Sequence, residues 1–323
     1  MMAAGHSRRQ RLGSHLRRSI QRVGSLHSPT YSSAFGMADE TAGWGQRVHL
    51  RLTRLELGLL VLAAASGFFH VVVGPHRIDL GGVAAVVLFT LTLVLRAYRM
   101  SVRPAIVWQD GRAAAESIKT LCWRYAVCGR LFPAGLDGAR ADRLFIERLR
   151  DTLDGIRGLQ LVQPADAAHE EITPWMRELR AAPLDERRDV YEKARVEDQQ
   201  RWYAGRTELN RRELQRWNLV VLGLEVLGVV AGSLKAFGLL DLSWSSGDLL
   251  GVAATLGAAA AAWVQTRQYA TLASAYAIAN EELSAIRALI GHAHDERRWA
   301  EFVDSAETAI SREHTMWRAS RPT

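Results

Sequence analysis

The sequence contains few cysteines and none of the motifs from which common catalytic sites are built. Its 323 residues include only two cysteines, Cys122 and Cys128, and their spacing places them about 240° apart on a helix. This spacing indicates neither a CxxC redox pair nor a metal site. No GxxxxGK[ST], HExxH or GxSxG motif occurs, so the signatures of phosphate loops, zinc proteases and serine hydrolases are absent. The sequence predicts no enzyme, no metal and no cofactor, and free cysteines fit a reducing compartment.

The first 36 residues contain no acidic residue. They carry six arginines and three histidines, and no apolar run long enough for the core of a signal peptide. We therefore expect residues 1–41 to form a basic disordered tail. The sequence MADE at Met37 also resembles a natural start, and the choice between Met1 and Met37 stays open.

Proline is absent between Pro183 and Pro322, so the chain from residue 185 onward can be helical except near residues 243–247. Three prolines, Pro164, Pro174 and Pro183, interrupt the preceding region, which also holds an amphipathic helix over residues 141–159. This pattern favours a helical, proline-containing cytoplasmic linker over residues 131–183.

Apolar residues gather in four runs of 16 to 18 residues, which are Leu57–Val73, Leu80–Leu95, Asn218–Leu234 and Leu249–Thr266. Such lengths lie near the lower limit for crossing a hydrocarbon core of ~30 Å. Buried helices of a soluble protein are the alternative that length alone permits.

Charges at the ends of these runs favour the membrane. Arginines flank the outer ends of both pairs: Arg47, Arg51, Arg54, Arg96, Arg99, Arg103, Arg211, Arg212, Arg216 and Arg267. The connections inside each pair, residues 74–79 and 235–248, hold little positive charge. Two hairpins with basic ends follow the positive-inside rule. We predict an all-α integral membrane protein with four transmembrane helices as two hairpins, long cytoplasmic helical extensions, and both termini and the central region in the cytoplasm.

The two hairpins resemble an internal repeat. After the second run comes Trp108 with Arg112 four residues later; at the end of the fourth comes Trp263 with Arg267 four residues later. Glu116 and Trp123 follow Arg112 on the same predicted helix. We divide the chain into a first two-span unit, residues 42–130, and a second unit with a helical stalk, residues 184–323.

The stretch YEKARVEDQQRWY has heptad spacing. Steps of four and three place on one helical stripe Tyr191, Arg195, Asp198, Trp202, Gly205 and Leu209. Asp198 as a general base would need a nucleophile, a metal or a phosphate loop, and nucleic-acid binding is disfavoured by the acids in the run. We interpret the stripe as a packing seam in which Arg195 and Asp198 pair and set the register. The same spacing continues after the fourth run at Leu272, Tyr276, Ala279, Leu283, Ile286 and Ile290.

Residues 191–218, the following hairpin and YATLASAYAIANEELSAI resemble the SLATT family, the SMODS- and SLOG-associating two-transmembrane effector domains. The terminal WAEFVDSAETAISREHTMW resembles it too, and WQDGRAAAESIKTLCWRYA of the first unit resembles another subtype. The resemblance implies an effector in the bacterial inner membrane, acting in anti-phage conflict systems with nucleotide-sensing or nucleotide-synthase partners. It also implies pore formation or membrane disruption.

Glu225 lies near the middle of the third run, where a carboxylate costs ~2.5–3.5 kcal/mol. It is the candidate for lining a pore; a neutral Glu225 hydrogen-bonded to Thr255 is the alternative. Small residues of the fourth run, Gly247, Gly251 and Gly257, are candidates for close helix packing and for homo-oligomerisation. A non-conducting, membrane-anchored scaffold or sensor that recruits cytoplasmic partners is the alternative function. No nucleic-acid partner is predicted.

Overall fold

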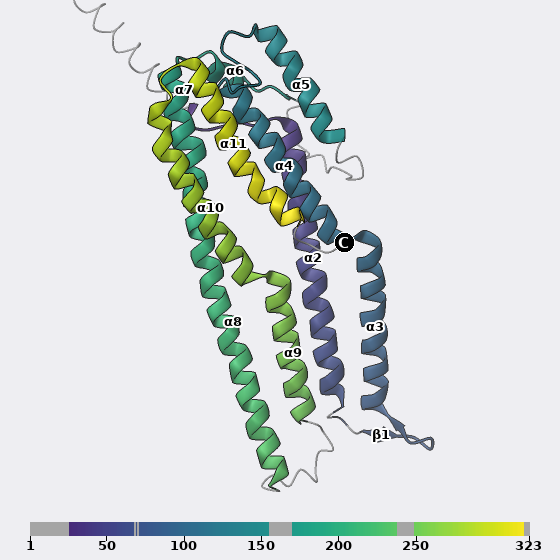
Figure 1. Ribbon diagram of the computed structural model, residues 1–323. Coiled ribbons are helices and arrows are strands. Elements are labelled where there is room, and N and C mark those ends of the chain that lie inside the picture. The colour runs from purple at the N-terminus through teal and green to yellow at the C-terminus, as the bar shows by residue number, and fades with distance from the viewer. Residues whose placement is uncertain (1–25, 68, 70, 155–169, 238–248, 320–323) are drawn as a thin grey trace, which may run out of the picture. The chain divides into compact units, whose positions relative to one another are not determined.

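The protein is built almost entirely from helices in the computed structural model, which describes residues 26–67, 69, 71–154, 170–237 and 249–319 (Figure 1). The helices are α2 (Ser33–Ser66), α3 (Leu80–Val102), α4 (Pro104–Ala126), α5 (Gly138–Asp154), α6 (Pro174–Arg180), α7 (Leu184–Tyr191), η1 (Glu192–Glu197, a π-helix), α8 (Asp198–Ala236), α9 (Leu249–Arg267), α10 (Tyr269–Leu289), η2 (Ile290–His292, a 3₁₀-helix) and α11 (Glu296–Ala319). Two short strands, β1 (Val72–Val73) and β2 (Ile78–Asp79), pair in antiparallel fashion.

The chain forms two compact structural units, called unit 1 and unit 2 below, whose residues differ from those of the two-span units expected from the sequence. Unit 1 contains Met1–Ala42, Gln109–Ala204 and Ala277–Thr323, and unit 2 contains Gly43–Trp108 and Gly205–Tyr276. Unit 2 holds all four predicted apolar runs, whereas unit 1 holds the charged middle and C-terminal parts of the chain.

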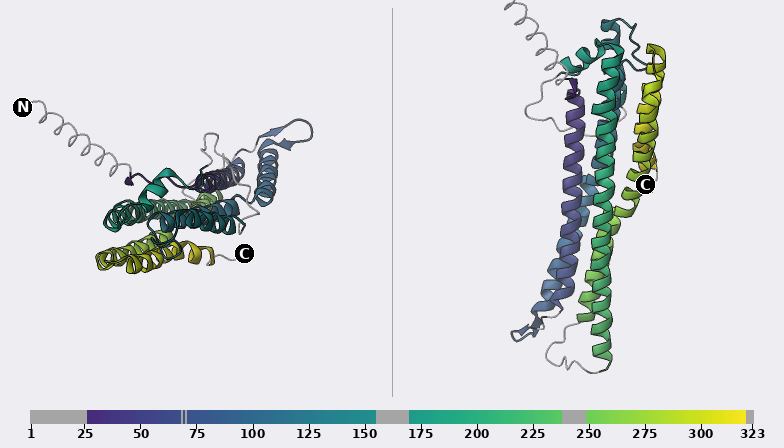
Figure 2. Two further views of the ribbon diagram at one scale, coloured as in Figure 1. Left: turned by 90° about the horizontal axis from the view of Figure 1, so that it is seen from above. Right: turned by 90° about the vertical axis from the view of Figure 1, so that its left-hand side faces the viewer.

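In unit 2 the C-terminal half of α2 lies beside α3, and the C-terminal half of α8 lies beside α9 (Figures 1 and 2). The connection from α2 to α3 is a short β-ladder, and Asp79 caps α3 by accepting a hydrogen bond of 3.0 Å from the Gly81 amide. A Cβ at Gly81 would lie 2.1 Å from the Phe69 carbonyl oxygen. Only glycine therefore permits the tight return of the first hairpin.

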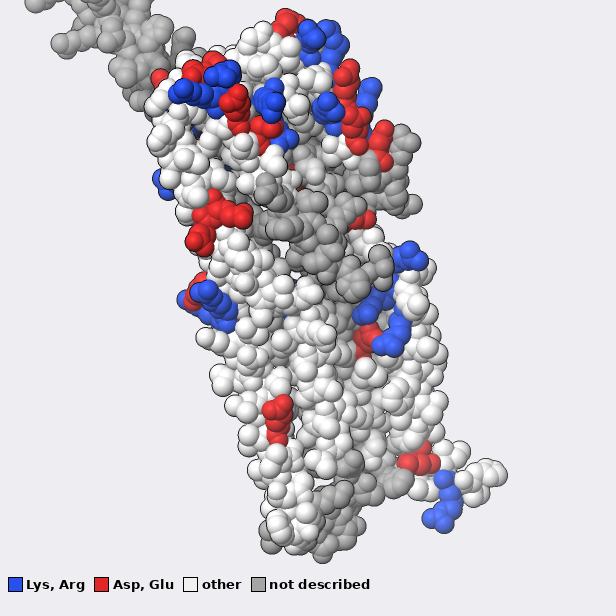
Figure 3. All heavy atoms as spheres, in the orientation of Figure 1, with Lys and Arg blue, Asp and Glu red and all other residues white. Residues whose placement is uncertain are grey.

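The apolar surfaces of unit 2 are exposed. Two helical stretches in the described part of the chain are long and apolar enough to cross a membrane, Leu80–Ala126 and Leu184–Leu234, and only 11% and 6% of their most apolar windows are buried. Charged side chains are sparse over the visible apolar faces of α8, α9 and α3 (Figure 3). The core helix of a soluble protein would be mostly buried, so this exposure favours lipid contact.

The core of unit 1 is organised around α4. Aromatic side chains radiate from it: Trp123 contacts Trp175 of α6 with ring centres 5.2 Å apart, and Tyr125 contacts Phe145 of α5 at 5.3 Å. The Trp299 indole of α11 donates a 2.7 Å hydrogen bond to the carbonyl of Val127. Each ring buries a large apolar area in an edge-to-face arrangement, which stabilises the packing of helices that are distant in sequence.

Residues 26–41 belong to this core, so the predicted disordered tail does not extend over them. Leu26 is fully buried, and its carbonyl accepts a 2.9 Å hydrogen bond from the Trp175 indole. The Tyr31 ring lies 4.9 Å from that of Phe35 and 6.1 Å from that of Trp175. The prediction failed because it was based on the arginine-rich composition of the first 36 residues, which does not reveal the short apolar segment that packs into the core. Residues 1–25 lie outside the described residues.

The expected linker over residues 131–183 is also part of unit 1 where it is described. Phe132, Phe145, Met176 and Leu179 are fully buried. Arg180 donates a 2.7 Å hydrogen bond to the carbonyl of Phe132 and so holds α6 against the end of α4. Pro174 occupies the first turn of α6 and Pro183 directly precedes α7, so these two prolines begin helices. Pro164 lies outside the described residues.

A chain that begins at Met37 should be less stable than one that begins at Leu26. The shorter chain lacks Leu26 and Tyr31, and loss of one buried leucine side chain alone costs about 2–5 kcal/mol. Thermal unfolding in detergent should show a lower midpoint for residues 37–323 than for residues 26–323, which should match the full chain. Equal midpoints for all three chains would show that residues 26–36 contribute nothing to unit 1.

Candidate functional site

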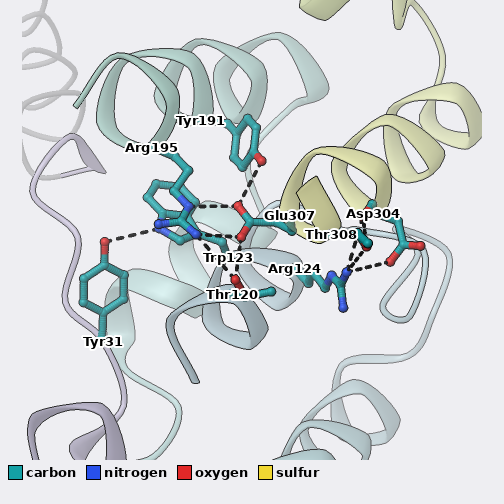
Figure 4. Close-up of polar contacts among 9 residues, drawn as sticks. All are labelled: Tyr31, Thr120, Trp123, Arg124, Tyr191, Arg195, Asp304, Glu307 and Thr308. Atoms are coloured by element: carbon teal, nitrogen blue, oxygen red, sulfur yellow. Dashed lines mark hydrogen bonds and ion pairs between the residues drawn. The ribbon is translucent and has the colours of Figure 1, made fainter. Parts of the chain in front are cut away.

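A buried ion pair lies at the centre of unit 1. Arg195 of η1 and Glu307 of α11 are 1% and 0% exposed in their side chains, and two hydrogen bonds join them (Figure 4). Arg195 Nε donates to Glu307 Oε1 at 2.9 Å, and Nη2 donates to Oε2 at 2.8 Å. This parallel two-bond geometry is the strongest arrangement of an arginine and a carboxylate.

Two hydroxyl groups complete the hydrogen bonds to Glu307. Tyr191 donates to Oε1 at 2.9 Å, and Thr120 of α4 donates to Oε2 at 2.9 Å. The carboxylate therefore accepts four hydrogen bonds, two at each oxygen. Such saturation offsets the cost of removing its charge from water.

Aromatic rings surround the pair and exclude water. The Tyr191 ring lies 5.6 Å from the rings of both Trp123 and Trp299 in edge-to-face contacts. The Trp123 indole donates a 3.2 Å hydrogen bond to the Tyr31 hydroxyl (Figure 4). These rings come from the segment before α2, from α4, from α7 and from α11, so the cluster joins four segments that are distant in sequence.

Burial sets the protonation of the groups in the cluster. Burial acts to lower the pKa of Arg195, but the charge and hydrogen bonds of Glu307 outweigh it and raise that pKa. Burial, reinforced by the Glu307 charge, raises the pKa of Tyr191 well above its ordinary value. Burial also raises the pKa of Tyr31 to about 12. Tyr191 thus remains a hydrogen-bond donor, and Arg195 a cation, over the whole physiological range.

The π-helix η1 determines which residues face this core. Tyr191, just before η1, and Arg195, within it, are both buried. After η1 the buried positions are Gln199 and Tyr203, followed in unit 2 by Thr207 and Asn210. The extra residue in the π turn shifts the stripe by one position relative to the heptad count. Asp198 is therefore exposed and pairs with Arg201 at 3.5 Å, and Leu209 is 46% exposed.

The predicted pairing of Arg195 with Asp198 is thus wrong. Glu307 is the true partner. Sequence reasoning missed it, although a carboxylate within the apolar stripe of α11, beside Val303 and Ala306, was a signal that could have found it.

A second polar cluster brings together other seam residues. Arg112 forms a 2.8 Å ion pair with Glu116 and lies 3.7 Å from Asp39. Its guanidinium also lies 5.7 Å from the centre of the Trp202 ring. Of the predicted seam residues, Tyr191, Arg195 and Trp123 meet in the first cluster, and Arg112, Glu116 and Trp202 meet in the second.

Neither cluster has the geometry of a catalytic centre. The carboxylate of Glu307 is saturated and enclosed, and burial raises the pKa of Cys122 to about 12, which keeps its thiol protonated. No group of three His, Cys, Asp or Glu residues in the described part of the chain could hold a metal ion. The arrangement is suited to fixing helix register.

The membrane candidates lie in unit 2. Glu225 of α8 is exposed and makes no hydrogen bond or ion pair with any described residue. Thr255 donates to the Gly251 carbonyl at 2.8 Å, so it is not the partner of Glu225. A Cβ at Gly257 would meet no atom within 4 Å, which shows that this glycine mediates no close packing inside the chain. Gly247 lies outside the described residues.

Close helix packing occurs instead at glycines not singled out in the sequence. A Cβ at Gly45 of α2 would lie 2.6 Å from the Trp108 amide nitrogen in unit 2, and one at Gly111 of α4 would lie 2.9 Å from the Ala42 amide nitrogen in unit 1. Both positions require glycine because the two backbones nearly touch.

The two tryptophans that the sequence aligned in the repeat lie on opposite sides of breaks in the helices. Each returning span ends in a non-glycine residue with left-handed backbone, Arg103 (φ 48°) after α3 and Gln268 (φ 52°) after α9. Trp108 follows its break, whereas Trp263 precedes its own. Arg112 likewise lies after the break at Arg103, whereas Arg267 lies just before the break at Gln268.

The comparison with known families matches nearly the whole chain. Residues 33–188 match the model of SMODS and SLOG-associating 2TM effector domain 3 (SLATT_3), and residues 191–317 match that of SMODS and SLOG-associating 2TM effector domain 1 (SLATT_1). The chain belongs to the SLATT family. It carries two different SLATT subtypes in tandem, as the sequence predicted. No curated protein and no solved structure matches it.

SLATT membership implies a membrane protein with an effector role in conflict systems and an association with nucleotide-signalling partners. The two domains also explain the cluster in unit 1. Arg195 and Glu307 come from the second SLATT domain, whereas Thr120 and Trp123 come from the first. The ion pair thus closes the second domain and attaches it to the first.

Breaking the pair from one side should destabilise the protein more than replacing both partners. Arg195→Met leaves Glu307 buried and uncompensated, which costs about 3–5 kcal/mol. The double variant Arg195→Met/Glu307→Leu removes both charges and should recover much of that loss. Unfolding midpoints in detergent measure the coupling. Additive effects of Arg195→Met and Glu307→Leu would contradict a direct interaction.

The stability of unit 1 should fall at alkaline pH, in part through Cys122. Its pKa rises from 9.0 to about 12 on folding, so between these values the unfolded chain loses a proton that the folded chain keeps. The contribution is complete below pH 9.0 and declines as the pH rises through this window, by about 1.4 kcal/mol per unit. Cys122→Ala should flatten the fall of the unfolding midpoint above pH 9.0. Cys128→Ala is the comparison, and because burial raises the pKa of Cys128 too, it should also flatten the fall. An unchanged slope in Cys122→Ala would contradict the raised pKa of Cys122.

Proposed function

We propose that this SLATT protein forms oligomeric pores in the bacterial inner membrane, with Glu225 in the pore lining. The observation that carries this proposal is the carboxylate itself. It lies on the apolar part of α8, is exposed, and has no polar partner among the described residues. A carboxylate facing lipid would cost ~2.5–3.5 kcal/mol, whereas one facing an aqueous lumen between copies would not.

The arrangement of unit 2 supports four spans with a common inner end. Glu56 of α2 is buried and forms 2.8 Å ion pairs with Arg96 and Arg99 at the end of the second apolar run. Trp217 before the third run and Trp263 near the end of the fourth have ring centres 6.3 Å apart. The basic and aromatic ends of the four runs thus meet on one side, as the positive-inside rule requires of two hairpins with cytoplasmic termini.

The lack of close packing at Gly257 supports contacts between copies. A Cβ at this position would meet no described atom within 4 Å, and small residues on a membrane helix allow another helix to approach closely. Four spans are too few to enclose a wide pore, so the proposed conducting state contains several copies. Unit 1 would receive the signal from a nucleotide-sensing or nucleotide-synthase partner.

The experiment compares membrane potential and dye entry in cells that express the full chain. Wild type should depolarise the membrane, and Glu225→Gln, which keeps the shape and removes the charge, should abolish or strongly slow that depolarisation. Glu213→Gln is the matched control because Glu213 lies on the same helix, before the apolar run, where it pairs with Arg216 at 3.0 Å. The control should behave as wild type.

Depolarisation by wild type and Glu225→Gln alike would keep the effector and remove Glu225 from the lining. Absence of depolarisation in all variants, also with neighbouring genes co-expressed, would contradict a pore and favour the membrane-anchored scaffold.

A further inference from the structure

Two arginines in unit 2 lie against one buried indole ring. The guanidinium carbon of Arg54, on α2, lies 4.9 Å from the centre of the Trp263 ring, and that of Arg267, at the end of α9, lies 5.9 Å from it. Trp263 is 8% exposed and Tyr269 is 3% exposed. The aromatic residues are therefore a fixed, buried support for two cations that come from different hairpins.

Both guanidinium groups keep unused hydrogen-bond donors. Arg54 forms no ion pair and no hydrogen bond with any described residue, and its side chain is exposed. Arg267 donates from Nε to the Tyr269 hydroxyl at 3.2 Å, and neither of its terminal nitrogens has an acceptor in the described part of the chain. Contact with aromatic faces holds the two cations without neutralising their charge.

Three other arginines near the ends of the apolar runs are paired with acids. Arg96 and Arg99 bind Glu56, and Arg216 binds Glu213. Arg54 and Glu56 are two positions apart on α2 and so point to opposite sides of the helix. Arg54 therefore lies apart from the ion pairs of Glu56 and beside the Trp263 ring.

We propose that Arg54 and Arg267 bind the phosphate groups of anionic phospholipids in the cytoplasmic leaflet. Arg54 lies three residues before the first apolar run, and Arg267 follows the last residue of the fourth, so both lie at the depth of lipid headgroups if these runs span the membrane. A guanidinium presents a planar set of donors that matches phosphate oxygens. Basic pockets between membrane helices on this side bind anionic headgroups.

This inference rests on the proposed membrane topology but not on conduction. Binding at this point would connect the first hairpin to the second through one lipid, because Arg54 belongs to the first and Arg267 to the second. Anionic lipid would then stabilise the arrangement of the four spans within unit 2.

The test measures lipid retained by the full chain. Protein is reconstituted into vesicles of phosphatidylcholine and phosphatidylglycerol in equal amounts, extracted in a mild detergent, and examined by native mass spectrometry. Wild type should retain phosphatidylglycerol, and Arg54→Gln/Arg267→Gln should retain at least tenfold less, since each lost charge-assisted contact weakens binding by roughly tenfold or more. Arg51→Gln/Arg216→Gln removes the same charge outside the aromatic contact and should retain lipid as wild type does.

Four outcomes would overturn the inference. Undiminished lipid in the Arg54→Gln/Arg267→Gln protein would exclude the site, and an equal loss in the control would show diffuse attraction only. Displacement of the lipid by millimolar inorganic phosphate would assign the site to a free anion. Lipid retention by a wild-type protein that fails to depolarise cells would leave this inference standing while the pore falls, whereas release of the protein from membranes by alkaline carbonate would refute both.

Discussion

The ion pair of Arg195 and Glu307 is the constraint to which the rest of unit 1 conforms. A cation and an anion without access to water are tolerable only when each is paired with the other, because either one alone carries a desolvation cost of several kcal/mol. Thr120 and Tyr191 supply the two remaining hydrogen bonds to the carboxylate. Three segments separated widely in sequence must therefore assemble together. An arrangement of α11 one turn away would bury an unpaired charge, so the pair selects one register among many that the alanine-rich stripe of α11 would allow.

The π-helix η1 is the local device that makes this geometry possible. Arg195 and Val196 within it are both buried, and beyond it the stripe of buried residues is displaced by one position. Arg287 of α10 then reaches across to Glu192 at the start of η1 and also contacts Glu197 at its end. Ionic contacts on the surface and the buried ion pair in the core thus hold the same six residues from both sides, which compensates for the poorer hydrogen bonding of a π turn.

Much of the fold follows from period and composition. Of the stripe from Leu272 to Ile290, Ala279, Leu283 and Ile290 are buried and the other three residues are half-buried, because α10 is a regular helix up to Leu289. The count fails at Asp198 and Leu209 because it assumes an uninterrupted α-helix, and no residue type indicates a π turn. Glu307 could not be predicted as the partner of Arg195 for another reason. The two residues are 112 positions apart, and the spacing of residues within one helix does not show which residue of another helix it contacts. Burial of Leu26 and Tyr31 was not predicted because the arginines that precede them dominate the average composition, which does not show that a few apolar residues pack into the core.

The breaks after α3 and α9 show what the two SLATT domains share. In each hairpin the outgoing helix, α2 or α8, runs unbroken, and the returning helix ends at a left-handed residue, Arg103 or Gln268. Such a conformation costs of order 1 kcal/mol for a residue with a side chain, so it persists only where packing demands it.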